Sequence, residues 1–293
     1  MEHVRWLDGG LAPAALTNPV VVAAFTGWND AGDAASTALR TLIETSQARA
    51  VAEIDPEWFT DFATVRPHVR LDDAQQRQIR WPTVGVWAAS LPGADALLIL
   101  GPEPALRWRL FCDQILGVAR HVGARMAITL GALLADVPHT RPTHVIGTAA
   151  DDDLIERFDL ERSNYEGPTG IVGVLQHEFA QAGLGTASLW AAVPGYAAQI
   201  TSPKAAIALI ERACAMIGTP VPRSTLLDRA GDYEAQVTGF IGDDDDLRTY
   251  VSRLESMTDE MEADTDSEPP AGLDDTDPAA LTAEIEKFLR EQE

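Results

Sequence analysis

The stretch FTGWNDAGDAA, residues 25–35, places side chains capable of binding or catalysis between a strand and a helix. The apolar, β-branched run at 19–26 predicts a buried strand, and a helical pattern follows the turn. Trp28, Asn29 and Asp30 therefore lie where proteins commonly bind phosphate, hold a catalytic group or meet another protein. Asp30 or its neighbour Asp33 can cap the helix, which explains one of them, but local structure does not explain Trp28 or Asn29.

The loop PHTRPTH, residues 138–144, carries His139 and Arg141 between two prolines that stiffen it. Arg141 can clamp a carboxylate or a phosphate, and His139 can act as a general base. In the alternative interpretation, the loop is simply rigid and Arg141 pairs with a nearby acid such as Glu103 or Asp136. The two histidines of the loop have no evident third ligand, so we predict no metal site here.

The segment GPEPALRWR, residues 101–109, places Glu103 just before a predicted helix, where the helix dipole favours a carboxylate. Trp108 and Arg109 follow in the first turns of that helix. Trp and Arg are the residue types that most often anchor protein interfaces, so this segment is a candidate contact surface.

A glycine-rich turn, GPTGIVG, begins another predicted helix, and its free backbone amides could hold an anion. A tight turn with close helix packing is the alternative. The turn is not a nucleotide-binding motif, because no Lys-Ser/Thr follows and the GxGxxG spacing is absent. The candidate residues of this segment are Tyr165 and Glu166 for binding, and Gly167, Thr169 and Gly170 for the anion-binding turn.

Composition argues against several classes of function. The net charge of −23, of which −14 falls on residues 241–293, disfavours binding to nucleic acid, which needs clustered cations. No apolar run reaches the roughly 18 residues of a membrane span, and the first residues do not resemble a secretory signal. Cys112 and Cys214 lie in apolar helical patterns typical of buried, reduced thiols. We therefore expect a cytoplasmic protein that binds neither nucleic acid nor membrane.

No complete catalytic motif is present. HEFAQ at 177–181 lacks the second histidine of the HExxH zinc motif, and the sequence contains no GxSxG, SxxK or CxxC. We expect no metal and no cofactor.

Short apolar runs alternate with helical patterns over the first three quarters of the chain. Strands are predicted at 19–26, 48–55, 82–89, 96–100, 126–131, 143–149 and 186–194, and helices after Asp30, before Gly123, at 168–183 and at 202–218. This alternation predicts an α/β fold whose mostly parallel sheet is covered on both faces. Functional loops of such folds lie beyond the carboxyl ends of the strands, so we expect the candidate residues at one rim.

The pattern changes after Pro222, which suggests four parts. Residues 1–222 form the α/β/α core domain, and 223–261 form a helical extension of two polar helices. Residues 262–278 are acidic and proline-containing, as in a flexible linker, and 279–293 predict a short C-terminal helix. The extension, the linker and this helix together form an acidic helical tail.

Five stretches taken together resemble one known family. FTGWNDAGDAAS, GPEPALRWRLF, LGALLADVPHTRP, YEGPTGIVGVL and SLWAAVPGY with SPKA after it are similar to segments of the proteasome assembly chaperone 2 family, more narrowly its actinobacterial branch. The resemblance covers roughly residues 15–220. It implies a three-layer α/β/α sandwich similar to nucleoside phosphorylase and hydrolase folds, and a tendency to form homo-oligomers.

The resemblance also implies a partner. Eukaryotic chaperones of the family help to assemble proteasome α-rings, and members that dock on proteasomes often carry a penultimate tyrosine that inserts into α-ring pockets. This chain ends Leu-Arg-Glu-Gln-Glu, so we do not expect insertion of that kind.

Two functions stay open at this point. The first is a non-enzymatic, oligomeric protein of the proteasome-assembly-chaperone type with an unknown protein partner. The alternative is an enzyme acting on a small anionic substrate (a nucleoside, phosphate or carboxylate compound) in a strand-end pocket. In the enzyme, Asn29 and Asp30 orient the substrate, Arg141 neutralises it, and His139 or Glu103 moves the proton. Convergence of residues 29, 103, 139, 141 and 166 on one closed cavity favours the enzyme, and dispersal favours a binding surface.

Overall fold

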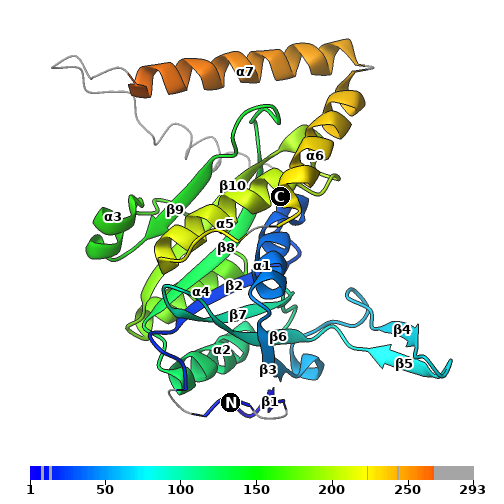
Figure 1. Ribbon diagram of the computed structural model, residues 1–293, viewed down its shortest axis with the longest axis vertical. Helices are drawn as coiled ribbons and strands as arrows, with labels where there is room; N and C mark the ends of the chain where they lie inside the picture. The colour runs from blue at the N-terminus through cyan, green and yellow to red at the C-terminus, as the bar shows by residue number, and fades with distance from the viewer. Residues whose placement is uncertain (8–9, 13–14, 223, 243, 267–293) are drawn as a thin grey trace.

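The computed structural model describes residues 1–266 except 8–9, 13–14, 223 and 243, and an eight-stranded sheet lies at the centre of this part (Figure 1). The strands follow one another across the sheet in the order β1 (Val4–Trp6), β3 (Arg49–Ile54), β6 (Val84–Ser90), β7 (Asp95–Pro102), β2 (Val20–Thr26), β8 (Met126–Ala135), β10 (Gly185–Pro194) and β9 (Val145–Ala149). The strands β7, β2, β8 and β10 lie side by side in the sheet and run parallel to one another.

The outer strands pair antiparallel with their neighbours, so the parallel region is the centre of a mixed sheet. The short turn 91–94 between β6 and β7 explains one of these pairings, because a tight turn can join only antiparallel strands. The predicted three-layer α/β/α class is confirmed, with its parallel strands in the middle.

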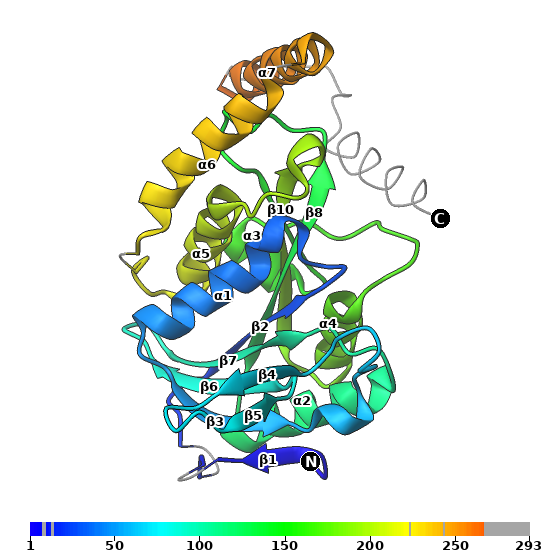
Figure 2. The same cartoon turned by 90° about the vertical axis from the view of Figure 1, so that its right-hand side faces the viewer.

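Helices cover both faces of the sheet (Figure 2). The helices α1 (Ala34–Thr45) and α5 (Pro203–Ile217) pack on one face, and α2 (Trp108–Val122) and α4 (Ile171–Gln181) pack on the other. Strand β2 is buried on both sides: Val22 points into the cluster under α1 and α5, and Val21 points into the cluster under α2 and α4. Because both faces of β2 are buried, its sequence is apolar at nearly every position.

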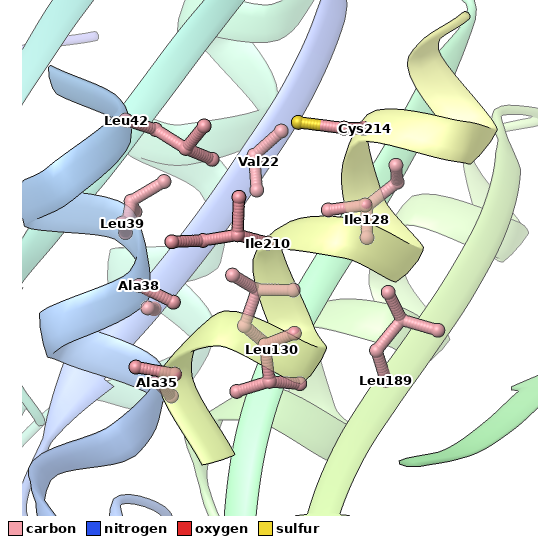
Figure 3. Packing of buried hydrophobic residues seen from close by; sticks show 14 of the residues in the cluster. Val22, Ala35, Ala38, Leu39, Leu42, Ile128, Leu130, Leu189, Ile210 and Cys214 are labelled. Atoms are coloured by element: carbon pink, nitrogen blue, oxygen red, sulfur yellow. The ribbon is translucent and has the colours of Figure 1, made fainter. Parts of the chain in front are cut away.

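The cluster under α1 and α5 is built from small and branched side chains that interdigitate (Figure 3). Leu39 and Leu42 of α1 face Ile210 of α5 over Val22 of β2. Cys214 is buried in the same cluster, and Cys112 is buried in the other, so the predicted burial of both thiols is confirmed. Burial raises the pKa of the Cys112 thiol to about 12 and that of Cys214 to about 11.

A β-hairpin stands apart from the main sheet and was not predicted. Its strands β4 (His68–Leu71) and β5 (Arg77–Arg80) form a separate two-stranded sheet, which projects from the body (Figure 1). Every residue of the two strands is exposed. The alternation in HVRL spans only four residues and RQIR has a single apolar residue, so the pattern is too short to predict the strands.

The extension consists of α6 (Leu226–Ile241) and α7 (Asp245–Asp266) (Figure 1). Helix α7 continues past the predicted boundary at residue 261, and the rest of the predicted linker and the helix at 279–293 lie outside the described residues. The remaining short helices are η1 (Ala31–Asp33), η2 (Pro56–Trp58), α3 (Asp152–Phe158) and η3 (Gly195–Ala197). Within the described residues, no helix has the length and apolar character needed to cross a membrane.

Candidate functional site

The parallel strands bring several of the candidate loops to one rim. The carboxyl ends of β2, β7, β8 and β10 point the same way, and the loops that leave them begin at residues 27, 103, 136 and 195. The polar side chains at this rim form two separate groups of contacts. The first group, which we call the rim cluster, consists of Asn29, Glu103, Gly170 and Ile171. The second group, which we call the latch, consists of His139 and Arg141 together with the residues of the extension that they contact.

Glu103 is the centre of the rim cluster. Its Oε1 accepts a hydrogen bond from Asn29 Nδ2 at 2.7 Å and another from the backbone amide of Ile171 at 2.8 Å. The carboxylate thus lies at the N-terminus of α4, where the helix dipole favours negative charge and a free amide needs an acceptor. Glu103 occupies the end of the helix at which an external anion was predicted.

Asn29 joins three elements of the core. It is fully buried, and its backbone oxygen accepts from the amide of Ala132 in β8 at 2.8 Å, while its side chain holds Glu103 after β7. The side chain also lies against Gly170, where an added Cβ would sit 2.2 Å from Asn29 Oδ1. Among the described residues, this Oδ1 has no hydrogen-bond partner. The contacts of Asn29 therefore explain its presence at the strand end, which the sequence alone left open.

Asp30 caps the helix that follows. Its Oδ1 accepts from the backbone amide of Ser36 at 3.0 Å, whereas Asp33 makes no capping bond and instead accepts the Thr201 hydroxyl at 3.1 Å. Burial raises the pKa of Asp30, and the hydrogen bonds from Ser36 partly offset that effect. Of the two predicted caps, Asp30 is the one that the structure supports.

His139 belongs to the latch. Its ring Nδ1 lies 2.9 Å from the Tyr196 hydroxyl and its Nε2 lies 3.0 Å from the Thr238 hydroxyl of α6. The side chain is almost fully buried, and burial together with the positive charge of Lys204 lowers its pKa. Both ring nitrogens are thus engaged: Nδ1 links the β8–β9 loop to η3, and Nε2 links it to the extension.

Arg141 completes the latch on α7. Its Nε and Nη2 donate to the two carboxylate oxygens of Asp259 at 2.6 and 2.8 Å, and Glu255 lies nearby. The alternative interpretation of a paired arginine is therefore supported, although the acid is Asp259, not Glu103 or Asp136. Asp136 instead accepts the Tyr250 hydroxyl at 2.6 Å.

Lys204 holds the same loop in place through hydrogen bonds to its backbone. Its ammonium donates to the backbone oxygens of His139 and Arg141 at 2.7 and 2.8 Å and to Glu234 of α6 at 2.5 Å. Lys204 was not among the residues predicted from the sequence. A signal was available, because Lys204 is one of only two lysines in the chain and lies in the first turn of a predicted amphipathic helix.

The other candidates make none of the contacts that define the two clusters. Trp28 is 52% exposed, and Trp108 is half-buried with its indole donating to the Pro104 oxygen at 2.5 Å. The Tyr165 hydroxyl donates to the Pro168 oxygen at 2.8 Å. The exposed candidates that complete the set are Arg109, Glu166, Gly167 and Thr169. In the described part of the chain, no three His, Cys, Asp or Glu side chains gather as a metal site would require.

Comparison with known proteins identifies the family. The PAC2 family model matches residues 24–241. A PAC2 family protein from Streptomyces avermitilis is 43% identical, with a TM-score of 0.74 over 80% of this chain and 99% of the other. A proteasome-assembly chaperone homologue from Mycobacterium tuberculosis is 42% identical, with a TM-score of 0.72 over 79% and 99%.

A third solved structure, a protein of unknown function from Mycobacterium tuberculosis, is 25% identical and covers 99% of this chain and 96% of its own, with a TM-score of 0.81. No curated protein matches the sequence. The family model covers well over half of the chain, and relatives above 40% identity share its fold. The chain therefore belongs to the PAC2 family, as the five sequence stretches predicted.

Proposed function

We propose that this protein is a cytoplasmic, homo-oligomeric binding protein of the proteasome-assembly-chaperone type, without enzymatic activity and with a proteasome-related protein partner. The proposal is supported by membership of the PAC2 family and by the similarity to a proteasome-assembly chaperone homologue at 42% identity.

The observation that carries the proposal is the dispersal of the candidate catalytic residues. An enzyme for a small anion needs Arg141 and His139 free to face the substrate, but Arg141 is bound by Asp259 and both ring nitrogens of His139 have partners. Glu103, the other candidate base, bonds to Asn29 and Ile171 in the rim cluster. The groups that acid–base catalysis would use therefore stabilise the fold in two different places.

The rim instead offers exposed side chains of the types found at interfaces. Trp28 projects its indole into solvent beside the buried Asn29, and Arg109 and Glu166 are also exposed. A half-exposed tryptophan in the turn that follows a buried strand is suited to anchor a partner, since its area is large. We assign Trp28 as the main contact of this surface.

Binding to purified proteasome α-subunits from the same organism tests the proposal. We expect the protein to bind them in size-exclusion and calorimetric experiments and to speed their assembly into rings. Trp28→Ala should weaken binding by about 30-fold, since an anchor residue contributes about 2 kcal/mol, and should leave the melting temperature unchanged.

Leu227→Ala is the matched control, because Leu227 is an exposed apolar residue on α6, away from the strand ends. It should leave binding unchanged. The proposal fails if neither α-subunits nor assembled proteasomes bind at micromolar concentrations. A thermal shift with nucleosides, phosphates or amino acids that disappears in Glu103→Gln would point to the enzyme instead.

A further inference from the structure

The edge strand β1 has backbone hydrogen-bonding groups that the sheet does not use (Figure 2). The Leu7 amide donates to β3 at 3.0 Å, and the His3 oxygen accepts the amide of Asp55, just after β3, at 2.9 Å. In this antiparallel ladder alternate residues bond to the neighbouring strand, so the amides and carbonyls of Val4 and Trp6 point away from β3. In the described part of the chain, no other strand pairs with β1 on that outer side.

The opposite edge of the sheet is covered by the chain itself. The Ala149 amide of β9 donates to the Glu161 oxygen at 2.9 Å, and the Glu161 amide donates to the Gly147 oxygen at 2.8 Å. The segment that follows α3 thus occupies the outer side of β9. Because an uncovered edge is a template for another strand, β1 is the edge at which a strand from outside can add.

A hollow of about 590 Å³ lies beside the first residues of β1 and is rich in carboxylates. We call it the acidic hollow; its lining includes Glu2, Arg5, Glu53, Asp55, Glu57 and Trp81. Arg5 is paired with Glu53. The other three carboxylates are exposed and form no ion pair with the described residues, so the hollow carries an excess of negative charge.

We propose that β1 accepts an extended segment of a partner protein as an additional strand, and that basic side chains of this segment enter the acidic hollow. Backbone bonds to Val4 and Trp6 hold the added strand, and the carboxylates of the hollow select its charge. The indole of Trp81, which is 49% exposed, offers a flat face on which a guanidinium can stack.

The two faces of β1 specify the pattern of the added strand. Val4 and Trp6 pack against the cluster under α2 and α4, whereas Arg5 between them lines the hollow. Residues opposite Val4 and Trp6 are therefore apolar, and those between them are polar. In antiparallel pairing the carboxyl end of the segment lies beside Glu2 at the start of β1, so the basic residues belong at that end.

This contact is separate from the one assigned to Trp28. Strands β3, β6 and β7 lie between β1 and β2, the strand that Trp28 follows. The contact does not require the homo-oligomer of the proposed function either. Binding of α-subunits and binding of a basic strand can therefore succeed or fail independently, and the two results are distinguishable.

Fluorescence anisotropy with a labelled heptapeptide tests the proposal. The probe consists of alternating valine and threonine and ends in two arginines, and it should bind with a dissociation constant below about 100 μM that rises with added salt. The same peptide ending in two glutamates should not bind. Only every second amide of an added strand faces β1, so N-methylation of one alternate set should abolish binding and N-methylation of the other set should not.

Two variants test the protein side of the contact. Glu2→Arg with Glu57→Arg reverses charge in the hollow and should raise the dissociation constant at least about tenfold. Glu44→Arg with Glu156→Arg is the matched control, since it makes the same change in net charge at exposed positions outside the hollow. It should keep the wild-type affinity. Val4→Pro removes an outward amide at an edge position, where proline is tolerated, and should also weaken binding.

Three results overturn the inference: no binding of the arginine peptide at about 1 mM, equal affinity of the hollow variant and its control, or equal binding of the two N-methylated peptides. The N-methylated peptides test the strand pairing even if Val4→Pro does not fold. If Val4→Pro instead lowers the molar mass of a wild-type oligomer in sedimentation velocity, β1 pairs with a second copy of the chain and the basic partner is ruled out.

Discussion

Glu103 and Asn29 are joined by a 2.7 Å hydrogen bond between residues that lie 74 positions apart in the chain. The same Glu103 oxygen accepts the first amide of α4, so one carboxylate connects the ends of β2 and β7 to a helix on the sheet surface. In many α/β proteins the N-terminus of a helix at this rim binds a phosphate. Here an internal carboxylate fills that role, which makes the rim a rigid platform beside the exposed Trp28.

Removal of the Glu103 carboxylate should destabilise the fold. Glu103→Ala leaves the buried Asn29 amide and the Ile171 amide without an acceptor, and we expect a loss of about 2–3 kcal/mol in the free energy of unfolding. Glu103→Gln retains an oxygen acceptor and should lose less. Urea denaturation measures both, with Glu44→Ala on the exposed side of α1 as a control that changes stability by under about 0.5 kcal/mol. An unchanged Glu103→Ala protein would show that the bonds contribute nothing.

Gly170 provides a steric test of the same cluster. The Cβ of Gly170→Ala would sit 2.2 Å from Asn29 Oδ1, and Asn29 cannot move away easily because it is fully buried and bonded to Glu103. We expect a loss of about 2 kcal/mol or more, caused by the clash alone since the backbone of Gly170 is extended. Gly231→Ala in α6 meets no atom within 4 Å and should instead stabilise by about 0.5–1 kcal/mol. Equal effects of the two substitutions would contradict the packing.

The elements with a buried face were predictable from the sequence. Helix α5 was expected at 202–218 and runs over Pro203–Ile217, because the Ser202 hydroxyl caps its start and Gly218, with a φ of +78°, ends it. Strand β2 was equally clear from its apolar run. The exposed hairpin offered only the four-residue alternation of HVRL, because none of its strand residues is buried in the described part of the chain.

The residues of the candidate site could be predicted from the sequence, but the way in which they group could not. Asn29, Glu103, His139 and Arg141 were all selected, but their grouping depends on partners far away in the sequence. His139 meets Thr238, 99 residues later, and Arg141 meets Asp259, 118 residues later. No local spacing encodes such pairs, so the division into a rim cluster and a latch had to come from the three-dimensional structure.

Protonation of His139 should loosen the extension. The groups that act on its ring are Lys204, which lowers its pKa together with burial, and Glu234 and Glu255, which raise it. Because the docked state lowers the pKa, it favours the neutral ring, and its stabilising effect is complete above the ordinary pKa of about 6.5. The effect is lost as the pH falls through the lower pKa of the docked state.

Hydrogen-exchange protection of α6 measures this effect once intrinsic exchange rates are taken into account. Protection should fall as the pH is lowered from 7 toward 5, and α2, which is remote from the latch, should keep its protection. The His139→Gln variant should show a weaker dependence on pH over this range. A wild type and a variant with the same dependence would show that carboxylates, not His139, control the docking of α6.

Loss of the Arg141 side chain should release α7 without unfolding the core. Arg141 donates to both oxygens of Asp259 from a loop fixed by Lys204, so Arg141→Ala removes the bidentate contact between the β8–β9 loop and α7. We expect limited proteolysis within α7 to become a few-fold faster at low ionic strength, with a smaller difference at high salt because partly exposed ion pairs are screened. Arg248→Ala is the control, since Arg248 pairs with Asp245 inside α7 and does not reach the loop. If the two variants are cleaved at the same rate, α7 is held by its buried Val251 and Leu254 alone, and the latch does not depend on Arg141.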